Sequence, residues 1–345
     1  DFSGPSGLRG GAACMQGWRV AMEDAHLALP NFDPVRGLSL FGVFDGHCGS
    51  VVARLASQLM PRKLAEARAL RRGDYPGALH EAFLAFDRYL DSPWGRKAVL
   101  EEAAKVRTDF AERLVGGPCE VEEGAELMQA LDEFCACSPD DMGCTAVVAL
   151  LEHGGGRLAA APRRLHVANC GDSRCVLWDD RGRAVNMSHD HKPRAKREFA
   201  RIKAAGSWVT GEGRIEGNLN LSRALGDFAY KRTRRADAPE KQVISGVPEV
   251  RTRELRPHDR FVLLACDGIW EARRGSQRTI DMLRRRLPPP GSHNKLSVAV
   301  AQFLQDHLAP VDDRTGLGLD NMTALLLQLP ELRGHLAKRP AAVRA

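Results

Sequence analysis

The stretch GCTAVVALLEHGGGRLAAAPRRLHVANCGDSRCVLWDD (residues 143–180) decides the fold class that we expect for this chain. It contains three apolar runs typical of β-strands, at 143–153, 164–172 and 173–180. Short connections separate these runs, and we interpret GDSR (171–174) as a tight hairpin turn. Neighbouring strands with such short connections favour an antiparallel arrangement, because parallel strands need a long crossover.

The rest of the chain adds both strands and helices. Further apolar runs predict buried strands at 38–45, 260–268 and 322–329. Apolar residues that recur every three or four positions predict helices at 49–70, 77–90, 97–115, 123–135, 193–206, 276–287 and 295–308. Because strands outnumber the helices that could cross between them, we expect an α+β fold with antiparallel sheets and helices packed outside.

Composition narrows the class of protein. The chain has 345 residues, of which 43% are hydrophobic and 27% charged, as expected for a soluble globular protein. No apolar run approaches the roughly 18 residues of a membrane span, and residues 1–14 lack the apolar stretch of a secretory signal. Four of the nine cysteines, Cys144, Cys170, Cys175 and Cys266, lie in apolar strands, which indicates buried free thiols in a reducing compartment. We therefore expect an intracellular protein, cytoplasmic or nuclear.

The positive charge does not indicate a nucleic-acid partner. The net charge is +6, but the basic residues are scattered or form short bursts such as 231–235 and 337–345. Aromatic residues make up only 6% of the chain and are not interleaved with the basic ones, so no stacking platform is expected. We read one domain over 11–330, with an extension at 1–10 and a basic tail at 331–345.

Acidic residues stand at the ends of the predicted strands. A single Asp at a strand end is usually a turn residue that caps its own backbone. Here several acids share this placement, and burying them together is costly unless a cation neutralises them. Oxygen ligands select Mg²⁺ or Mn²⁺ over Zn²⁺. The residues are Glu23, Asp24, Asp45, Asp267 and Asp320.

Eight motifs occur in a fixed order over residues 10–330. They are GWRVAMEDAH, FGVFDGHCG, MGCTAVVAL, VANCGDSR, DHKP, LNLSRALGDF, LLACDGIWE and DNMTALLLQL. Together they resemble the motif series of the type 2C metal-dependent protein serine/threonine phosphatases. The resemblance implies a four-layer αββα sandwich, in which two packed antiparallel sheets are flanked by helices.

The resemblance also implies a binuclear centre of Mg²⁺ or Mn²⁺. Asp45 would bridge both ions. Asp267 and Asp320 would complete one site, and Glu23 with the Gly46 carbonyl the other. Two such ions roughly 3.5–4 Å apart would make a nucleophile from bridging water, which would attack the phosphoserine or phosphothreonine ester directly.

Further roles follow from the same resemblance. Asp24 would orient water at the centre. Arg19 would hold the substrate phosphate with its guanidinium fork. His47 would be the general acid that protonates the leaving serine or threonine oxygen; the alternative is a loop histidine that fixes local structure. A weaker third site would use Asp140, with Asp141 as a neighbouring candidate, and Glu271.

Some features stay open or depart from the family pattern. Cys48 stands where the family usually has glycine. HDHKP (189–193) could suggest zinc, but a structural turn leading into the helix at Pro193 is favoured. Residues 194–245 would include a variable flap beside the site. We expect a monomer acting on phosphorylated proteins; the alternatives are a pseudophosphatase that serves as a binding or regulatory module, and a phosphoesterase for small molecules.

Overall fold

The structure is a computed structural model of the chain. It describes residues 1–116, 137–232, 238–273, 275–289, 292, 294–310 and 318–330. The helix predicted at 123–135 and the basic tail at 331–345 lie outside the described residues. None of the described helices combines the length and the apolar character that a membrane crossing requires.

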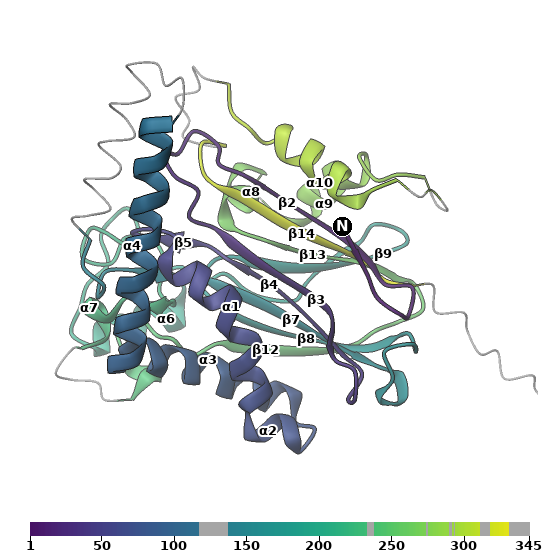
Figure 1. Cartoon of the computed structure of the whole chain (residues 1–345), viewed down its shortest axis with the longest axis horizontal. Helices are drawn as coiled ribbons and strands as arrows, with labels where there is room; N and C mark the ends of the chain where they lie inside the picture. Colours follow the sequence, from purple (N-terminus) through teal and green to yellow (C-terminus); the bar gives the residue numbers. More distant parts are fainter. Residues whose placement is uncertain are drawn as a thin grey trace, which may run out of the picture.

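Two large antiparallel sheets form the centre of the molecule (Figure 1). Sheet A has the strand order β1-β2-β14-β13-β9-β10 and sheet B the order β12-β8-β7-β4-β3. The strands of sheet A are β1 (Phe2–Ser3), β2 (Arg9–Met15), β14 (Met322–Gln328), β13 (Asp259–Ala265), β9 (Arg174–Asp179) and β10 (Ala184–Asn186). Those of sheet B are β12 (Glu249–Glu254), β8 (Pro162–Cys170), β7 (Ala146–His153), β4 (Leu38–Phe44) and β3 (Ala25–Asp33). A small sheet C joins β11 (Leu225–Gly226), β6 (Gly143–Cys144) and β5 (Gly46–His47).

Strand β7 shows why the sequence of the central strands is apolar almost throughout. Val147, Ala149 and Leu151 belong to the core between the two sheets. Val148 and Leu150 belong to the core between sheet B and its helices. Side chains alternate along a strand, so a sheet covered on both faces needs apolar residues at every position.

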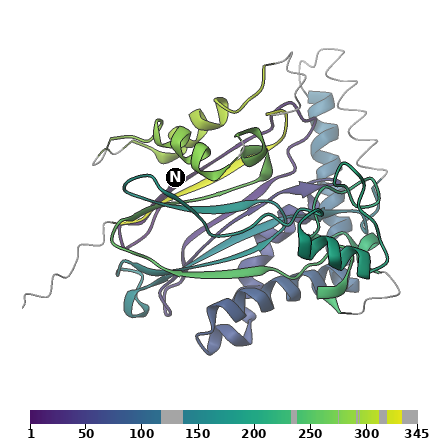
Figure 2. The same ribbon diagram turned by 180° about the vertical axis from the view of Figure 1, so that it is seen from behind.

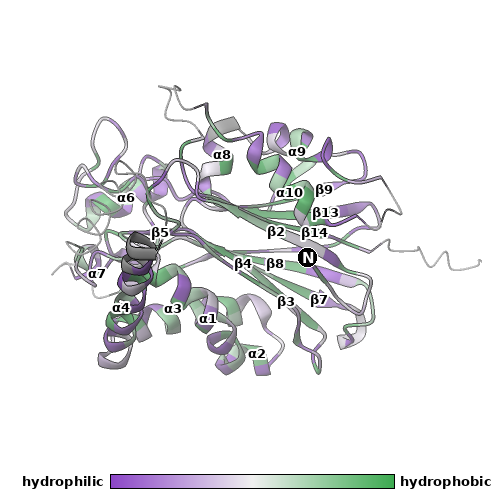
Figure 3. Ribbon diagram, turned by 45° about the horizontal axis from the view of Figure 1, so that its top comes forward, coloured by the Kyte–Doolittle hydropathy of each residue, from purple (hydrophilic) through white to green (hydrophobic). Residues whose placement is uncertain are grey.

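Helices cover the outer face of each sheet (Figure 3). On the side of sheet B, α1 (Val51–Glu66) and α3 (Tyr75–Asp91) pack against the strands, and α2 (Arg68–Arg71) and α4 (Pro93–Gly116) pack against these two helices. Those on sheet A are α8 (Asp267–Arg273), α9 (Ser276–Arg284) and α10 (Leu296–Gln305). On α3, Leu79, Phe83, Phe86 and Leu90 are all buried, which is the apolar stripe of a helix packed on one side. The predicted α+β class and its four-layer αββα sandwich are confirmed.

The segment that joins β10 to β12 in the sequence has a small hydrophobic core of its own. It contains α6 (Lys196–Ala204) and α7 (Phe228–Lys231), and Figures 1 and 2 both place this segment at the end of the molecule where β5 lies. Ile202, Ile215 and Ile244 are its fully buried isoleucines. The short 3₁₀ turns are Gly154–Gly156 and Pro239–Lys241.

Three local predictions need correction. The helix predicted at 49–70 divides into α1 and α2, because Ala67 takes an extended conformation with φ −60° and ψ 133°. The helix predicted to start at Pro193 begins at Lys196 instead. The hairpin predicted at GDSR is wrong, since β8 lies in sheet B and β9 in sheet A. This turn crosses between the sheets and carries the buried Asp172 to their shared end.

Candidate metal centre and active site

The acidic side chains predicted from the sequence gather at one end of sheets A and B. Strands β3 and β4 pair antiparallel, so the start of β3 lies beside the end of β4. Strands β13 and β14 pair in the same way, so the end of β13 lies beside the start of β14. The acids just outside these four strand ends are therefore brought together by the topology. They are Asp24, Asp45, Asp267 and Asp320.

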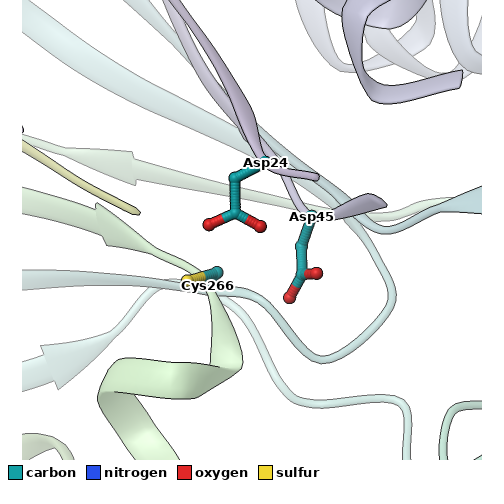
Figure 4. A group of neighbouring side chains, drawn as sticks. All are labelled: Asp24, Asp45 and Cys266. Carbon is teal, nitrogen blue, oxygen red and sulfur yellow. The ribbon is translucent and has the colours of Figure 1, made fainter. Parts of the chain in front are cut away.

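Asp24 and Asp45 form one acidic cluster with the Cys266 thiol (Figure 4). One ligand atom of each lies within 4.8 Å of the other two. Burial raises the pKa of Asp24 to about 6, although Thr323 and Cys266 act to lower it. Burial, followed by the charge of Asp24, also raises the pKa of Asp45 well above its usual value. These carboxylates therefore lack the positive charge that would stabilise their ionised forms.

The donor atoms of this cluster fit a divalent cation. Neither carboxylate oxygen of Asp24 has a well-formed hydrogen bond within the described part of the chain. Burying such a group is costly, and a bound cation would offset that cost. Carboxylate oxygens suit hard cations such as Mg²⁺ and Mn²⁺. The Cys266 thiol instead donates a hydrogen bond to the Asn321 carbonyl at 3.4 Å, and sulfur suits these hard cations less well than oxygen does.

Asp267 belongs to a second acidic cluster, with Asp172 and Glu271, in which the three carboxylates also lie within 4.8 Å of one another. The Lys192 Nζ donates to Asp172 Oδ2 and Glu271 Oε1, both at 2.6 Å, and lies 3.8 Å from Asp267 Oδ2. Burial and the charge of Asp172 raise the pKa of Asp267 well above its usual value. The pKa of Lys192 is raised as well, since three carboxylates outweigh its burial. An ammonium group thus supplies positive charge beside Asp267.

Glu23 is fixed by two hydrogen bonds that connect it to other parts of the site. Its Oε1 accepts a hydrogen bond from the Gly49 backbone N–H at 2.6 Å. Its own backbone N–H donates to Asn321 Oδ1 at 2.8 Å. The Asn321 amide also donates to the carbonyls of Gln16 and Ala21, so it links β14 to the loop that carries Glu23. Sequence reasoning missed Asn321, although it directly follows a predicted ligand.

Gly46 occupies a position that admits no side chain. A Cβ built there would lie 2.4 Å from the Glu23 carbonyl oxygen. The residue also pairs with Cys144 in sheet C, which fixes its backbone beside the acidic cluster. A glycine is therefore required for the backbone to approach Glu23 this closely. The role of its carbonyl as a ligand stays a prediction.

Arg19 lies at the open side of the same site. Its Nη2 donates to Asp320 Oδ2 at 2.9 Å, and its side chain is 59% exposed. The two neighbouring residues, Trp18 and Val20, are exposed as well. The guanidinium group can thus reach a ligand that approaches the acidic residues from solvent.

His47, which is half-buried, forms a dyad with Asp227. The His47 Nε2 lies 2.7 Å from Asp227 Oδ1, and Asp227 is fully buried. Burial alone would lower the pKa of His47, but the charge and hydrogen bond of Asp227 raise it. Gly143 leaves room for the dyad, because a Cβ there would lie 2.5 Å from both contacting atoms. Sequence reasoning used the motif LNLSRALGDF only for the resemblance and did not assign a role to Asp227.

The two residues predicted for a third metal site have different partners. The Asp140 carboxylate accepts hydrogen bonds from Arg96 at 3.1 Å and from Arg232 at 2.6 Å. Asp141 accepts a hydrogen bond from the Ser138 hydroxyl at 2.8 Å. Glu271 instead groups with Asp172 and Asp267. A third site that combines Asp140 with Glu271 therefore stays a prediction.

The histidines of HDHKP have structural partners. His191 is buried, and its Nδ1 accepts a hydrogen bond from the Gly171 N–H at 3.1 Å. His189 Nδ1 lies 3.2 Å from Glu249 Oε1. Between them, Asp190 makes a two-pronged ion pair with Arg174, at 2.8 and 2.6 Å. These contacts favour the structural turn over the zinc alternative.

The chain is similar to known proteins over most of its length. The family model described as protein phosphatase 2C matches residues 8–109 and 96–309. The chain is similar to probable protein phosphatase 2C 11 of Oryza sativa, with 36% identity over 93% of this chain and 85% of that protein. It is 37% identical to probable protein phosphatase 2C 6 of Paramecium tetraurelia, over 93% of this chain and 92% of that protein.

Solved structures show the same fold. A phosphatase from a pathogenic strain of Toxoplasma gondii superposes with a TM-score of 0.62 at 21% identity, over 95% of this chain and 97% of that one. The match to the family model spans most of the chain, and the curated relatives exceed 30% identity over nearly their full lengths. This chain therefore belongs to the protein phosphatase 2C family.

Proposed function

We propose that this chain is a metal-dependent protein serine/threonine phosphatase, which hydrolyses phosphoserine and phosphothreonine esters. The observation that carries the proposal is the group of partly buried carboxylates at the start of β3 and the end of β4, where ligand atoms of Asp24 and Asp45 lie within 4.8 Å of each other. Membership of the protein phosphatase 2C family supports the same activity. The pseudophosphatase alternative is not favoured, because the predicted acidic ligands are all present.

Five residues would hold the two Mg²⁺ or Mn²⁺ ions in this proposal. Asp45 would bridge them, Asp267 and Asp320 would bind one, and Glu23 with the Gly46 carbonyl would bind the other. When bound, the ions activate water for attack and neutralise charge that develops on the phosphate. Asp24 would accept hydrogen bonds from water at the centre, since both of its oxygens lack a well-formed partner among the described residues.

Arg19 would bind two phosphate oxygens and orient the ester. Its exposed guanidinium group already lies beside Asp320, so it can contact a substrate at the edge of the acidic cluster. Bound substrate would compete with Asp320 for Arg19, and this exchange would place the phosphorus next to the metal ligands.

His47 would donate a proton to the serine or threonine oxygen as the ester bond breaks. Asp227 holds Nε2 and favours the charged imidazolium, so the proton would leave from Nδ1. An alkoxide is a poor leaving group, and protonation in the transition state typically contributes about 10²- to 10⁴-fold to the rate. Asp227 is a positioning residue in this scheme.

The remaining assignments are also proposals. We propose that residues 11–330 form the catalytic domain, that the protein is an intracellular monomer, and that phosphorylated proteins are its substrates. A weaker third cation would use Asp140 and Glu271. It would compete with Lys192 for Glu271 and with Arg96 and Arg232 for Asp140.

Release of phosphate from a phosphothreonine peptide tests the proposed function. We expect turnover with Mn²⁺ or Mg²⁺, and none after treatment with a chelator. A small sugar phosphate at the same concentration serves as the comparison and should be hydrolysed more slowly. No metal-dependent turnover of the peptide, or a clear preference for the sugar phosphate, would contradict the proposal.

A further inference from the structure

A buried ion pair lies next to the turn that carries Asp227. Lys231 Nζ on α7 lies 2.7 Å from Asp87 Oδ1 on α3. Only 2% of the Lys231 side chain and 11% of the Asp87 side chain are exposed. The pair is therefore shielded from solvent, and the proposed reaction gives neither residue a role.

The pair also binds the backbone of that turn at two places. The Gly226 N–H donates a hydrogen bond to Asp87 Oδ1 at 2.9 Å. Lys231 Nζ donates a second one to the Ala224 carbonyl at 2.8 Å. Ala224 and Gly226 lie just before Asp227 in the chain, whereas Lys231 follows it on α7. The two residues thus join both sides of the turn to each other and to helix α3.

The backbone of the turn adopts a conformation that needs such support. Gly226 has φ +84° and Asp227 has φ +53°, so both lie in the left-handed region. A Cβ at Gly226 would lie 2.4 Å from the Met142 carbonyl oxygen, which shows how closely the turn packs against the residue before β6. A left-handed residue other than glycine is costly and persists only where the surrounding structure fixes it. The hydrogen bond between Gly226 and Asp87 is one such contact, directly beside Asp227.

A gain in stability does not explain why a charged pair is buried here. Replacing a buried ion pair by apolar residues is often neutral or stabilising, because the ions lose their hydration on burial. Helix α3 is already fixed by the apolar side chains that it packs into the core, which are Leu79, Phe83, Phe86 and Leu90. Apolar residues at 87 and 231 could not, however, make the two hydrogen bonds to the backbone of the turn.

We propose that Asp87 and Lys231 are positioning residues, which hold the turn at 224–231 so that the Asp227 carboxylate stays in contact with His47. Neither residue touches the substrate, and both act through Asp227. The contact between Asp227 Oδ1 and His47 Nε2 is 2.7 Å, and a misplacement of about 1 Å in a catalytic arrangement can cost about 10²-fold in rate. The effect on turnover rests on the proposed function, whereas the effect on the turn does not.

Amide hydrogen exchange of the Mg²⁺-loaded protein tests the effect on the turn. The double variant Asp87→Ala/Lys231→Met removes both hydrogen bonds and leaves neither charge buried without its partner. We expect exchange of the amides at 224–231 to be at least about tenfold faster than in the wild type, with no change in β13. Unchanged exchange at 224–231 would overturn the proposal.

Two further variants complete this experiment. Asp179→Ala is the matched control, because Asp179 is also a buried carboxylate that binds a turn, with Oδ1 accepting from the Arg181 and Arg183 N–H groups at 3.1 and 2.8 Å. It should leave exchange at 224–231 unchanged. Asp87→Asn keeps an acceptor oxygen but loses the charge that strengthens its hydrogen bonds, so exchange there should rise at least about threefold. If the double variant does not fold, Asp87→Asn decides, and no rise would overturn the proposal.

Turnover tests the consequence for catalysis. In the double variant, kcat for a phosphothreonine peptide should fall at least about tenfold, but kcat for an aryl phosphate less than about threefold, because only the peptide's leaving oxygen needs a proton. The same two substitutions added to Asp227→Asn should slow the peptide no further, since the pair acts through Asp227. Equal slowing of both substrates, or further slowing of Asp227→Asn, would overturn the positioning role. A wild-type enzyme without metal-dependent turnover would instead contradict the proposed function, while amide exchange would still test the hold on the turn.

Discussion

His47 and Asp227 come from segments 180 positions apart in the chain, yet their side chains meet at 2.7 Å. The contact depends on Gly143, where any side chain would overlap both atoms. Asp227 itself has a left-handed backbone with φ +53°, a conformation that Asp tolerates better than most residues. The missing side chain at Gly143 and the left-handed backbone of Asp227 therefore allow the Asp227 carboxylate to contact the His47 imidazole.

Asp227→Asn tests this contact without removing the histidine. We expect turnover of a phosphothreonine peptide to fall about 10- to 100-fold, because the amide no longer favours the imidazolium that donates the proton. An aryl phosphate with an acidic leaving group should slow less than about threefold, since its phenolate needs no proton. The measurement is kcat for both substrates.

His47→Gln provides the comparison for that variant. It should show the same dependence on the leaving group, and the double variant should be no slower than His47→Gln alone. Equal slowing of the peptide and the aryl phosphate would show that Asp227 supports the fold of the site and not the proton donor.

The sequence predicts the place of some residues in the candidate site but not of others. Asp45 and Asp267 could be found because each follows a strongly apolar strand and precedes glycine. Asp172 could not, because GDSR has the composition of an ordinary hairpin turn. Only the separation of β8 and β9 into two sheets brings Asp172 to the site.

One carboxylate on helix α6, that of Glu198, makes hydrogen bonds to its own helix and to the rest of the segment. Glu198 accepts hydrogen bonds from Arg201 at 2.6 Å, from the Ser222 hydroxyl at 2.8 Å and from Arg223 at 2.7 Å. Burial alone would raise the pKa of Glu198, but the two arginines lower it to about 2. This network therefore stabilises the folded protein only while Glu198 is ionised.

Glu198→Gln should destabilise the protein in a manner that depends on pH. A lowered pKa contributes stability above the unfolded value of about 4.5, and this contribution is lost as the pH falls toward 2. The difference in unfolding free energy between wild type and variant should be about 3 kcal/mol at pH 7 and smaller at pH 3. Urea unfolding at both pH values measures it.

Glu240→Gln is the control for that experiment, because Glu240 is exposed in the same segment. Its unfolding free energy should change by less than about 0.5 kcal/mol at either pH. A Glu198→Gln difference that stays constant between pH 7 and pH 3 would contradict the role of the ion pairs.

Whole elements were predictable where burial imposes a clear pattern. Strand β4 was found because it is a continuous apolar run, and helix α3 because its apolar residues recur every three or four positions. Strand β2 was missed because its sequence RGGAACM is rich in small residues. These residues serve close packing, since a Cβ at Gly11 would lie 2.2 Å from the Ser297 backbone near the start of α10. Strand β12 was missed because EVRTRE carries four charges at the edge of sheet B.

At the scale of the whole molecule, the candidate site exists because two sheets end at one place. Sheet B supplies Asp24 and Asp45 through β3 and β4, and sheet A supplies Asp267 and Asp320 through β13 and β14. The core between the sheets fixes these ends relative to each other. Buried acids so placed repel one another, which is the condition that divalent cations would relieve.

Asp267→Asn addresses this arrangement most directly, because it removes one charge from the centre while changing little volume. Asp306→Asn is the matched control, since Asp306 forms an exposed ion pair with Arg286, with Nη2 and Oδ1 2.7 Å apart. The measurement is Mn²⁺-dependent release of phosphate from a phosphothreonine peptide by the wild type and both variants. We expect Asp267→Asn to be at least about 100-fold slower than the wild type and Asp306→Asn to match it; equal rates for the wild type and Asp267→Asn would contradict the proposed metal centre.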